Sequence, residues 1–187
     1  MDTSHYFFAL SLPNEVKDPL WEISQQAKEI FPFKSWVHHA DYHITLAFLG
    51  KAEQHMLADA VSHVRESLQG VPSFQLSLNH AGTFGRQDAP RILWVNTKDS
   101  ASLRRVRDHV YTACGKAGFQ LETRPFKPHI TIARSWVSER KFQMKALEES
   151  VFSCLPDTVF SIKEVVLYRT HPQKLPKYEK AECFPLV

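Results

Sequence analysis

The sequence predicts an α+β fold with two lobes, in which two antiparallel sheets face a central cleft. Short apolar runs typical of strands alternate with amphipathic runs typical of helices along the 187 residues. The order strand, helix, strand, helix, strand occurs twice. The middle strand of each half carries a histidine and a threonine two residues apart. Together these observations indicate an internal duplication whose halves are related by a pseudo-twofold axis.

The first half, residues 1–84, opens with the aromatic and aliphatic run HYFFALSL, which ends at Pro13 and predicts a strand. Asn14 can cap the helix that follows, and apolar residues recur there at helical spacing. Gly50 ends the strand that contains the first histidine, His43, and Gly70 stops the next helix. The predicted elements are strand 5–12, helix 14–30, the strand around His43, helix 53–68 and strand 74–84.

The second half, residues 91–168, repeats this order after a linker near residues 82–90. Its predicted elements are strand 91–97, helix 100–117, strand 129–133, helix 138–150 and strand 159–168. The remaining segment, 169–187, holds three prolines and three lysines, and we expect a loop and an edge strand that returns through 178–186. Residues 1–187 are therefore predicted to form a single bilobal domain.

The register of the two halves supports the duplication. Phe8 precedes His43 by thirty-five positions, and Trp94 precedes His129 by the same number. Trp94 takes its place in the alternation of the predicted strand RILWVNT, so we expect it to lie in the core.

Composition limits the class of protein. Hydrophobic residues at 43% and charged residues at 23% are typical of a globular chain, and no apolar run is long enough to cross a bilayer. The first fifteen residues lack the basic leader of a signal peptide. Three scattered cysteines suit a reducing compartment, so we expect a cytoplasmic monomer with no membrane partner. The net charge of +3 and a pI near 8.7 are compatible with a phosphate-bearing ligand.

The paired H-x-T strands indicate phosphodiester chemistry. Residues i and i+2 of a strand share a face, so His43 lies beside Thr45, and His129 lies beside Thr131. If the halves face each other, two imidazoles and two hydroxyls converge. One imidazole can take a proton from an attacking group while the other gives one to the leaving oxygen, and the hydroxyls can hold the non-bridging oxygens.

Chance does not account for the pair. Ten histidines and nine threonines in this chain predict roughly 0.5 H-x-T matches. Here two matches occur, each with isoleucine in the middle and an aliphatic residue after the threonine, at equivalent places in the two halves. A single histidine of this kind is by default a core residue whose ring nitrogens have hydrogen-bond partners, but the matched pair favours a shared site.

The segments HITLAFLG and RPFKPHITIAR resemble the paired signatures of the two-histidine phosphoesterase superfamily. The similarity extends through FFALSLP, the LWV strand and the closing LYR and FPL segments, and it is greatest to the RNA 2′,3′-cyclic phosphodiesterases, historically called 2′-5′ RNA ligases. The resemblance implies conversion of a terminal 2′,3′-cyclic phosphate to a 2′-phosphate with no metal and no other cofactor.

The resemblance also implies roles for individual residues. His43 would protonate the departing ribose O3′, and His129 would activate water. Phe48, five residues after the first histidine, would stack on the base, and Arg134, five after the second, would bind the phosphate. An ideal strand turns both of these away from their histidines, so each strand must end or bulge first. A core position is the alternative for Phe48, and a surface cation is the alternative for Arg134.

Other histidines and cations receive simpler interpretations. The run HHADYH places His38, His39 and His43 close together, but no carboxylate or cysteine completes a familiar zinc spacing, so His38 and His39 are expected in a loop. The basic run Arg104, Arg105 and Arg107 is expected on a solvated helix face, and Lys174, Lys177 and Lys180 are expected in solvent. An RNA path along either group stays open.

Several functions remain open from the sequence. The leading hypothesis is hydrolysis of cyclic phosphate at RNA ends. The same side chains can run the reverse reaction, a 2′,5′ ligation to a 5′-hydroxyl, or open the cyclic phosphate of a small nucleotide. A non-catalytic module that binds RNA ends is the alternative from another class, although the presence of all four histidine and threonine side chains argues against it.

Overall fold

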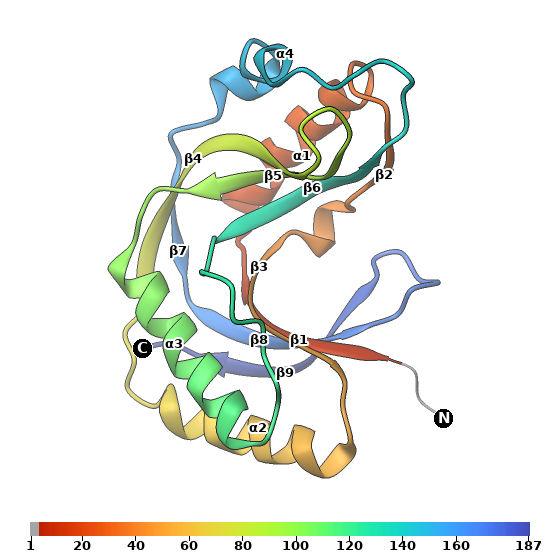
Figure 1. Ribbon diagram of the computed structural model, residues 1–187. Coiled ribbons are helices and arrows are strands. Elements are labelled where there is room, and N and C mark those ends of the chain that lie inside the picture. The colour runs from red at the N-terminus through yellow and green to blue at the C-terminus, as the bar shows by residue number, and fades with distance from the viewer. Residues whose placement is uncertain (1–3) are drawn as a thin grey trace.

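Within residues 4–187, nine antiparallel strands form one strongly curved sheet that bends into two lobes, and helices cover its outer faces (Figure 1). The computed structural model describes residues 4–187. The strand order is β7-β4-β5-β6-β3-β1-β8-β9, and β2 pairs with β6 on a separate branch. At the middle of this order a single residue pair, Ile44 with Ile130, joins β3 to β6. This architecture confirms the predicted α+β class, and the two predicted sheets are the two halves of one continuous sheet.

The first lobe lies at the bottom of Figure 1 and contains the sheet β3-β1-β8-β9 with two outer helices. Its strands and helices are β1 (His5–Ser11), β3 (His43–Lys51), β8 (Glu164–Thr170), β9 (Tyr178–Pro185), α2 (Gln54–Ser67) and α3 (Ala101–Lys116).

The second lobe lies above it and contains the strands β7, β4, β5, β6 and β2. Its elements are α1 (Asn14–Lys28), β2 (Phe33–Trp36), β4 (Phe74–Gly85), β5 (Pro90–Thr97), β6 (His129–Trp136), α4 (Met144–Glu148), η2 (Val151–Cys154) and β7 (Val159–Ile162). A short 3₁₀ turn, η1 (His39–Asp41), connects β2 to β3 between the lobes.

The chain crosses repeatedly between the lobes. It leaves β1 in the first lobe to form α1, which contacts β2 and η2 of the second lobe. Later it leaves β5 in the second lobe to form α3, which packs on α2 and on β3 of the first lobe. Neither lobe is therefore built from one continuous half of the sequence.

Alternating side chains explain why these segments form strands and helices. In β6 the residues Ile130 and Ile132 are fully buried, and they pack with Leu93 and Val95 of β5 in the hydrophobic core. In α3 the buried residues recur at helical spacing, and the Ser100 side chain caps the helix by accepting a hydrogen bond from the Leu103 amide at 3.2 Å. No helix within residues 4–187 is long and apolar enough to span a membrane.

The predicted helix over residues 138–150 is wrong for most of its length. Only Met144–Glu148 is α-helical, and the 3₁₀ turn η2 follows it. The preceding residues are held in an irregular path because the Phe142 amide donates to the carbonyl of Asp88, and the Val137 amide donates to that of Pro32. Long-range backbone bonds therefore take the place of the first helical turns.

Two strand predictions also need correction. The predicted strand 159–168 is two strands, because the chain leaves β4 after Ile162 and pairs with β1 from Val165 onwards. The intervening Lys163 stays out of both ladders, and its carbonyl accepts the Leu186 amide at 2.8 Å. The short strand β2 was not predicted at all.

Trp94 does not lie in the core. In β5 the buried residues are Leu93 and Val95, so Trp94 points to the opposite, cleft-facing side, where it is half-buried. Phe8, which stands at the same distance from its histidine along the sequence, is fully buried. The equal thirty-five-residue spacing therefore does not make these two residues structural equivalents.

Candidate active site

The two H-x-T motifs lie side by side on neighbouring strands. Ile44 pairs with Ile130 in an antiparallel register, and both side chains are buried in the core. The flanking residues consequently point to the cleft. Antiparallel register sets His43 opposite Thr131 and Thr45 opposite His129. The backbone thus brings the four predicted polar side chains to one face at the junction of the lobes.

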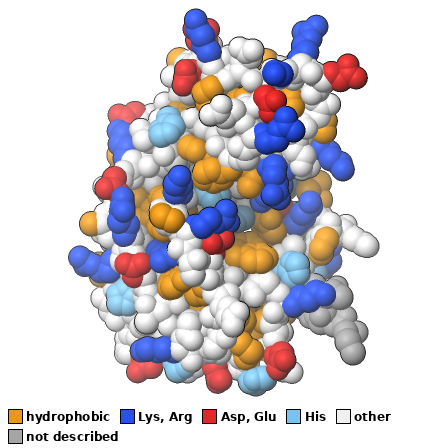
Figure 2. Space-filling model, in the orientation of Figure 1, with side chains coloured by type: hydrophobic (Ala, Val, Ile, Leu, Met, Phe, Trp, Pro, Cys, Tyr) orange, Lys and Arg blue, Asp and Glu red, His pale blue; other side chains and the backbone are white. Residues whose placement is uncertain are grey.

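Figure 2 shows this face of the molecule from the side used in Figure 1. A hollow lies between the two lobes, with histidine side chains (pale blue) inside it and Lys and Arg side chains (blue) along its edges. Apolar side chains also reach the hollow. A site of this kind offers an anionic ligand both positive charge and apolar surface.

His43 is oriented by its own strand and by the turn before it. Its Nδ1 lies 2.7 Å from the Asp41 carbonyl oxygen, and its Nε2 lies 3.1 Å from the Thr45 hydroxyl. A carbonyl can only accept, so Nδ1 carries the hydrogen, and in the neutral ring Nε2 is the basic nitrogen. This nitrogen is the one available for proton transfer.

His129 is oriented in the same way. Its Nδ1 donates to the carbonyl oxygen of Lys127 at 2.7 Å, which again leaves Nε2 for proton transfer. In both lobes the histidine is therefore fixed by the carbonyl two residues earlier. The duplication extends beyond the side chains to the backbone groups that set the tautomer.

A β-bulge in β3 places Phe48 on the same side as His43. The ladder with β1 skips Leu46, so this strand uses one extra residue between Thr45 and Ala47. A bulge of this kind reverses the alternation of side chains beyond it. Phe48 is 56% exposed and is therefore not a core residue. Its ring lies edge-on to that of His5, with 5.8 Å between centroids.

An equivalent bulge in β6 does the same for Arg134. The ladder with β5 skips Ile132, which is the extra residue between Thr131 and Ala133. Arg134 is exposed and lies close enough to lower the pKa of both His43 and His129 by its positive charge. The bulges that the Phe48 and Arg134 assignments require are thus present, at matching positions in the two halves.

Aromatic rings surround His43. The centroids of Phe7, Tyr178 and Tyr168 lie 4.8, 5.1 and 5.9 Å from the centroid of the imidazole. Burial among these rings lowers the pKa of His43 to about 4, and the charges of Arg134 and His129 act in the same direction. The hydrogen bond to the Asp41 carbonyl opposes this shift.

The environment of His129 differs. Burial is again the main cause that lowers its pKa, with Arg134 adding to the effect and the Lys127 carbonyl opposing it. Phe84 stands perpendicular to the imidazole at 4.9 Å, and Trp94 lies beyond it with 5.2 Å between the two aromatic centroids. The cleft face of the second lobe therefore carries an aromatic surface next to His129.

Sequence reasoning missed two residues of this site, Asp41 and Tyr178. Asp41 is a buried carboxylate two residues before His43, and its place as the lone acid in the run WVHHADYH was the available signal. Tyr178 reaches His43 from the returning segment, 135 positions away in the chain, and no local pattern indicates that contact.

The discounted histidines have partners elsewhere. His38 accepts the Ala40 amide through Nδ1 at 3.1 Å, and the Nε2 of His39 lies 2.6 Å from an oxygen of Asp18. Within residues 4–187 no group of three or more His, Cys, Asp or Glu side chains is arranged to hold a metal ion.

The basic run of α3 is only partly a solvated face. Arg104 is exposed and pairs with Asp99. Arg107 is instead packed over the rings of Tyr111 and Phe126, with its guanidinium carbon 3.9 and 5.3 Å from their centroids. The tail lysines are exposed as expected, and Lys180 pairs with Glu164.

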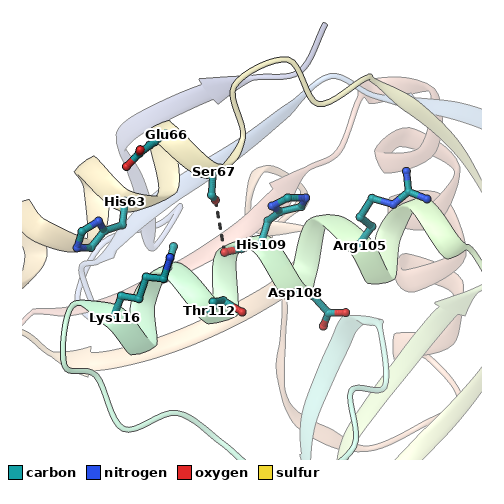
Figure 3. A pocket seen from close by; sticks show the side chains of 9 residues that line it. His63, Glu66, Ser67, Arg105, Asp108, His109, Thr112 and Lys116 are labelled. Carbon is teal, nitrogen blue, oxygen red and sulfur yellow. Dashed lines mark hydrogen bonds between the residues drawn. The ribbon is translucent and has the colours of Figure 1, made fainter.

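A second hollow lies away from the histidine pair, between α2 and α3. It has a volume of about 470 Å³, and the side chains of His63, Glu66, Arg105, His109 and Lys116 border it (Figure 3). The Ser67 hydroxyl is 3.4 Å from the carbonyl oxygen of His109 across its floor. Charges of both signs line this open groove, so its electrostatics favour no particular ligand.

The 2′-5′ RNA ligase superfamily matches residues 16–174 of the sequence. The chain belongs to this superfamily. A member from Geobacillus stearothermophilus named RNA 2′,3′-cyclic phosphodiesterase is 46% identical over 189 residues, which are 100% of this chain and 59% of that relative. The chain therefore spans less than two thirds of that relative's length. A Bacillus subtilis member of the same name is 33% identical over 97% of this chain and 96% of its own.

Solved structures of the superfamily share the fold. The crystal structure of E. coli LigT complexed with 3′-AMP superposes with a TM-score of 0.75 at 22% identity, covering 100% of this chain and 99% of that one. A structure from Thermus thermophilus gives a TM-score of 0.77 at 23% identity over 97% of each chain. Superfamily membership and fold thus agree with the arrangement of the two motifs.

Proposed function

We propose that the protein hydrolyses the 2′,3′-cyclic phosphate at an RNA or oligonucleotide end to a 2′-phosphomonoester. The observation that carries this proposal is the pair of H-x-T motifs on adjacent strands, in which each histidine donates Nδ1–H to a backbone carbonyl and keeps Nε2 for proton transfer. The name shared by the Geobacillus and Bacillus relatives supports the choice of substrate.

The reaction is an in-line displacement at phosphorus. His129 Nε2 takes a proton from water while the water oxygen bonds to phosphorus. The bond from phosphorus to O3′ breaks, and His43 Nε2 gives its proton to that oxygen. The product carries a 2′-phosphate and a free 3′-hydroxyl. His129 ends protonated and His43 neutral, so one proton must return through solvent before the next turnover.

Three neutral or cationic groups hold the phosphate. The hydroxyls of Thr45 and Thr131 donate to the non-bridging oxygens, and the Arg134 guanidinium neutralises their charge. Phe48 offers an exposed ring on which the terminal base stacks. Each of these side chains reaches the cleft because of the motif itself or the bulge that follows it.

The low pKa of His43 is compatible with a role as the general acid. Burial disfavours the imidazolium form, but a bound phosphate anion beside the ring favours it and raises its pKa. A protonated His43 in such a site is a strong acid towards the departing alkoxide. Substrate binding therefore supplies the charge that this histidine needs.

A turnover assay on an oligonucleotide with a 2′,3′-cyclic phosphate tests this function. We expect a 2′-phosphomonoester as the product, with activity that survives EDTA treatment and is lost in His43→Ala and His129→Ala. A 3′-phosphate product, or turnover that requires added zinc or manganese, would contradict the mechanism. We further infer a monomer that acts on RNA ends or small cyclic nucleotides. Its three free thiols, Cys114, Cys154 and Cys183, support a cytoplasmic location.

A second reaction, 2′,5′ ligation, is favoured by the aromatic surface beside His129. Phe84 and Trp94 lie on the side from which the nucleophile enters, where a nucleoside can stack and present its 5′-hydroxyl in place of water. His129 then takes the hydroxyl proton and the new bond joins that 5′-oxygen to phosphorus. Product analysis with excess 5′-hydroxyl RNA checks this, and hydrolysis alone at saturating acceptor would argue against it.

A further inference from the structure

The returning segment before β9 is fastened to the turn before β3 by one buried carboxylate. Asp41 is 4% exposed, and its two oxygens accept the backbone amides of Lys177 at 2.8 Å and Tyr178 at 3.1 Å. A further hydrogen bond closes the loop of residues 171–177, from the His171 amide to the Lys177 carbonyl at 2.7 Å. These contacts fix the backbone at the start of β9.

Tyr178 is thereby placed against the first catalytic histidine. Its ring stands edge-on to His43 at 5.1 Å and to Phe7 at 5.0 Å. Its hydroxyl lies close to the Arg134 guanidinium, which lowers the pKa of the phenol through charge and a hydrogen bond, while burial raises it by more. The phenol consequently stays neutral and keeps its hydrogen near neutral pH.

We propose that the Tyr178 hydroxyl is a further ligand of the substrate phosphate, and that Asp41 is the positioning residue that places it. This inference rests on the proposed function, because it assigns a residue to the same phosphate site. Asp41 itself lies behind the histidine and touches no substrate.

The chemistry of the pair supports this role. Arg134 has only hydrogens to offer, so a contact between its guanidinium and the phenol oxygen leaves the hydrogen of the phenol free to donate. A phosphate oxygen is the strong acceptor that the proposed reaction brings to this place. Arg134 comes from the second lobe and Tyr178 from the first, so together they hold one phosphate from both sides of the cleft.

Asp41 also connects this contact to the acid catalyst. Its carbonyl accepts the Nδ1 hydrogen of His43, while its carboxylate holds the amide of Tyr178. One residue thus sets the direction of the imidazole with its backbone and the position of the phenol with its side chain. Replacing the side chain alone should disturb mainly the phenol.

The first test compares two tyrosines that touch the same imidazole. Tyr178→Phe keeps the ring but removes the hydroxyl near Arg134, whereas Tyr168→Phe removes a hydroxyl that faces Ser11. We expect Tyr178→Phe to lower kcat/KM for a cyclic-phosphate oligonucleotide about tenfold, mainly through KM, and to weaken binding of adenosine 2′-monophosphate similarly in calorimetry. Tyr168→Phe should change both by less than about twofold. Equal effects of the two substitutions would overturn the proposal.

The second test places Asp41 in a double-mutant cycle with Tyr178. Asp41→Asn keeps the size of the side chain but turns a donor towards one of the two amides. If Asp41 acts through Tyr178, Asp41→Asn should weaken adenosine 2′-monophosphate binding in the wild-type background and have little further effect on it in Tyr178→Phe. If the losses of binding in the two variants add up in the double variant, Asp41 stabilises the backbone there without acting through Tyr178.

The outcomes separate this inference from the proposed function. A wild-type protein that fails to turn over the cyclic phosphate contradicts the function, whereas the calorimetric comparison of the tyrosine variants still measures the phosphate contact. Active wild-type protein with an undiminished Tyr178→Phe contradicts the inference alone. If Asp41→Asn does not fold, the two tyrosine variants still decide whether the hydroxyl binds phosphate.

Discussion

The Thr45 hydroxyl lies 3.1 Å from His43 Nε2, so the first motif is internally hydrogen-bonded at the nitrogen that we propose transfers the proton. A hydroxyl can rotate from this nitrogen to a phosphate oxygen, so Thr45 serves both groups. We expect Thr45→Val, which keeps the shape and loses the hydroxyl, to lower kcat/KM by about 10-fold to 100-fold. Thr45→Ser should retain most activity. Steady-state kinetics on a cyclic-phosphate oligonucleotide measures both, and an active Thr45→Val would remove this residue from the site.

Phe48→Ala should alter substrate preference with little effect on folding. The ring is 56% exposed, so its loss opens no cavity in the core. Stacking on a base contributes roughly 1–3 kcal/mol, and we expect a corresponding loss of kcat/KM for substrates with a terminal base. Ribose 2′,3′-cyclic phosphate, which lacks a base, should be turned over as by the wild type. A large fall in Tm together with an unchanged preference would return Phe48 to a structural role.

The pH profile of kcat/KM should be bell-shaped and should depend on Arg134. One imidazole must be protonated and the other neutral, so the rate falls at both extremes, with apparent pKa values that belong to the pair. Arg134 lowers the pKa of both His43 and His129. Arg134→Ala removes this cation, so both pKa values rise and the optimum moves to higher pH, while kcat/KM falls for every substrate.

Arg134→Lys is the matched control for that experiment. It keeps the positive charge, so the optimum should stay near that of the wild type. It loses the bidentate hydrogen bonding of the guanidinium to the phosphate, so KM should still rise. An optimum that moves to lower pH in Arg134→Ala would be inconsistent with the electrostatics of the site.

The two histidines should behave as one catalytic unit. A general acid or base typically contributes ~10²–10⁴-fold, so we expect His43→Ala and His129→Ala each to lose at least that factor in kcat. The double variant should lose less than the product of the two single losses, because neither residue is effective without its partner. Full multiplicative loss, measured with enzyme in excess over substrate, would indicate independent roles.

The sequence alone predicted the parts of the fold that depend on local pattern. Alternation along HITLAFLG and HITIAR and helical periodicity in 14–28 and 101–116 were sufficient, because each of these segments buries one face in the core. The failures have a common cause. Residues 137–143, the break at Lys163 and the strand 33–36 are fixed by partners far away in the sequence, which no local pattern records.

For the candidate site, the local pattern predicted that the two H-x-T motifs meet on one face, but it did not predict their surroundings. The bulges at Leu46 and Ile132 were required by the assignments of Phe48 and Arg134, yet the sequence does not place them. Trp94 was misplaced because the alternation that assigned it to the core also fits the opposite face. Tyr178 was missed because a tyrosine in a charged tail has no signature until the carboxylate that holds it is known.

The pairing of Ile44 with Ile130 makes the spacing between His43 and His129, the proposed acid and base, a property of the backbone ladder. Enzymes whose catalytic groups lie on separate domains must close around the substrate before chemistry, and closure often limits their rate. Here the chain crosses between the lobes several times, and the two histidines flank one interstrand pair. If these histidines are the catalytic pair, folding alone assembles them, and substrate binding needs no hinge motion to bring them together.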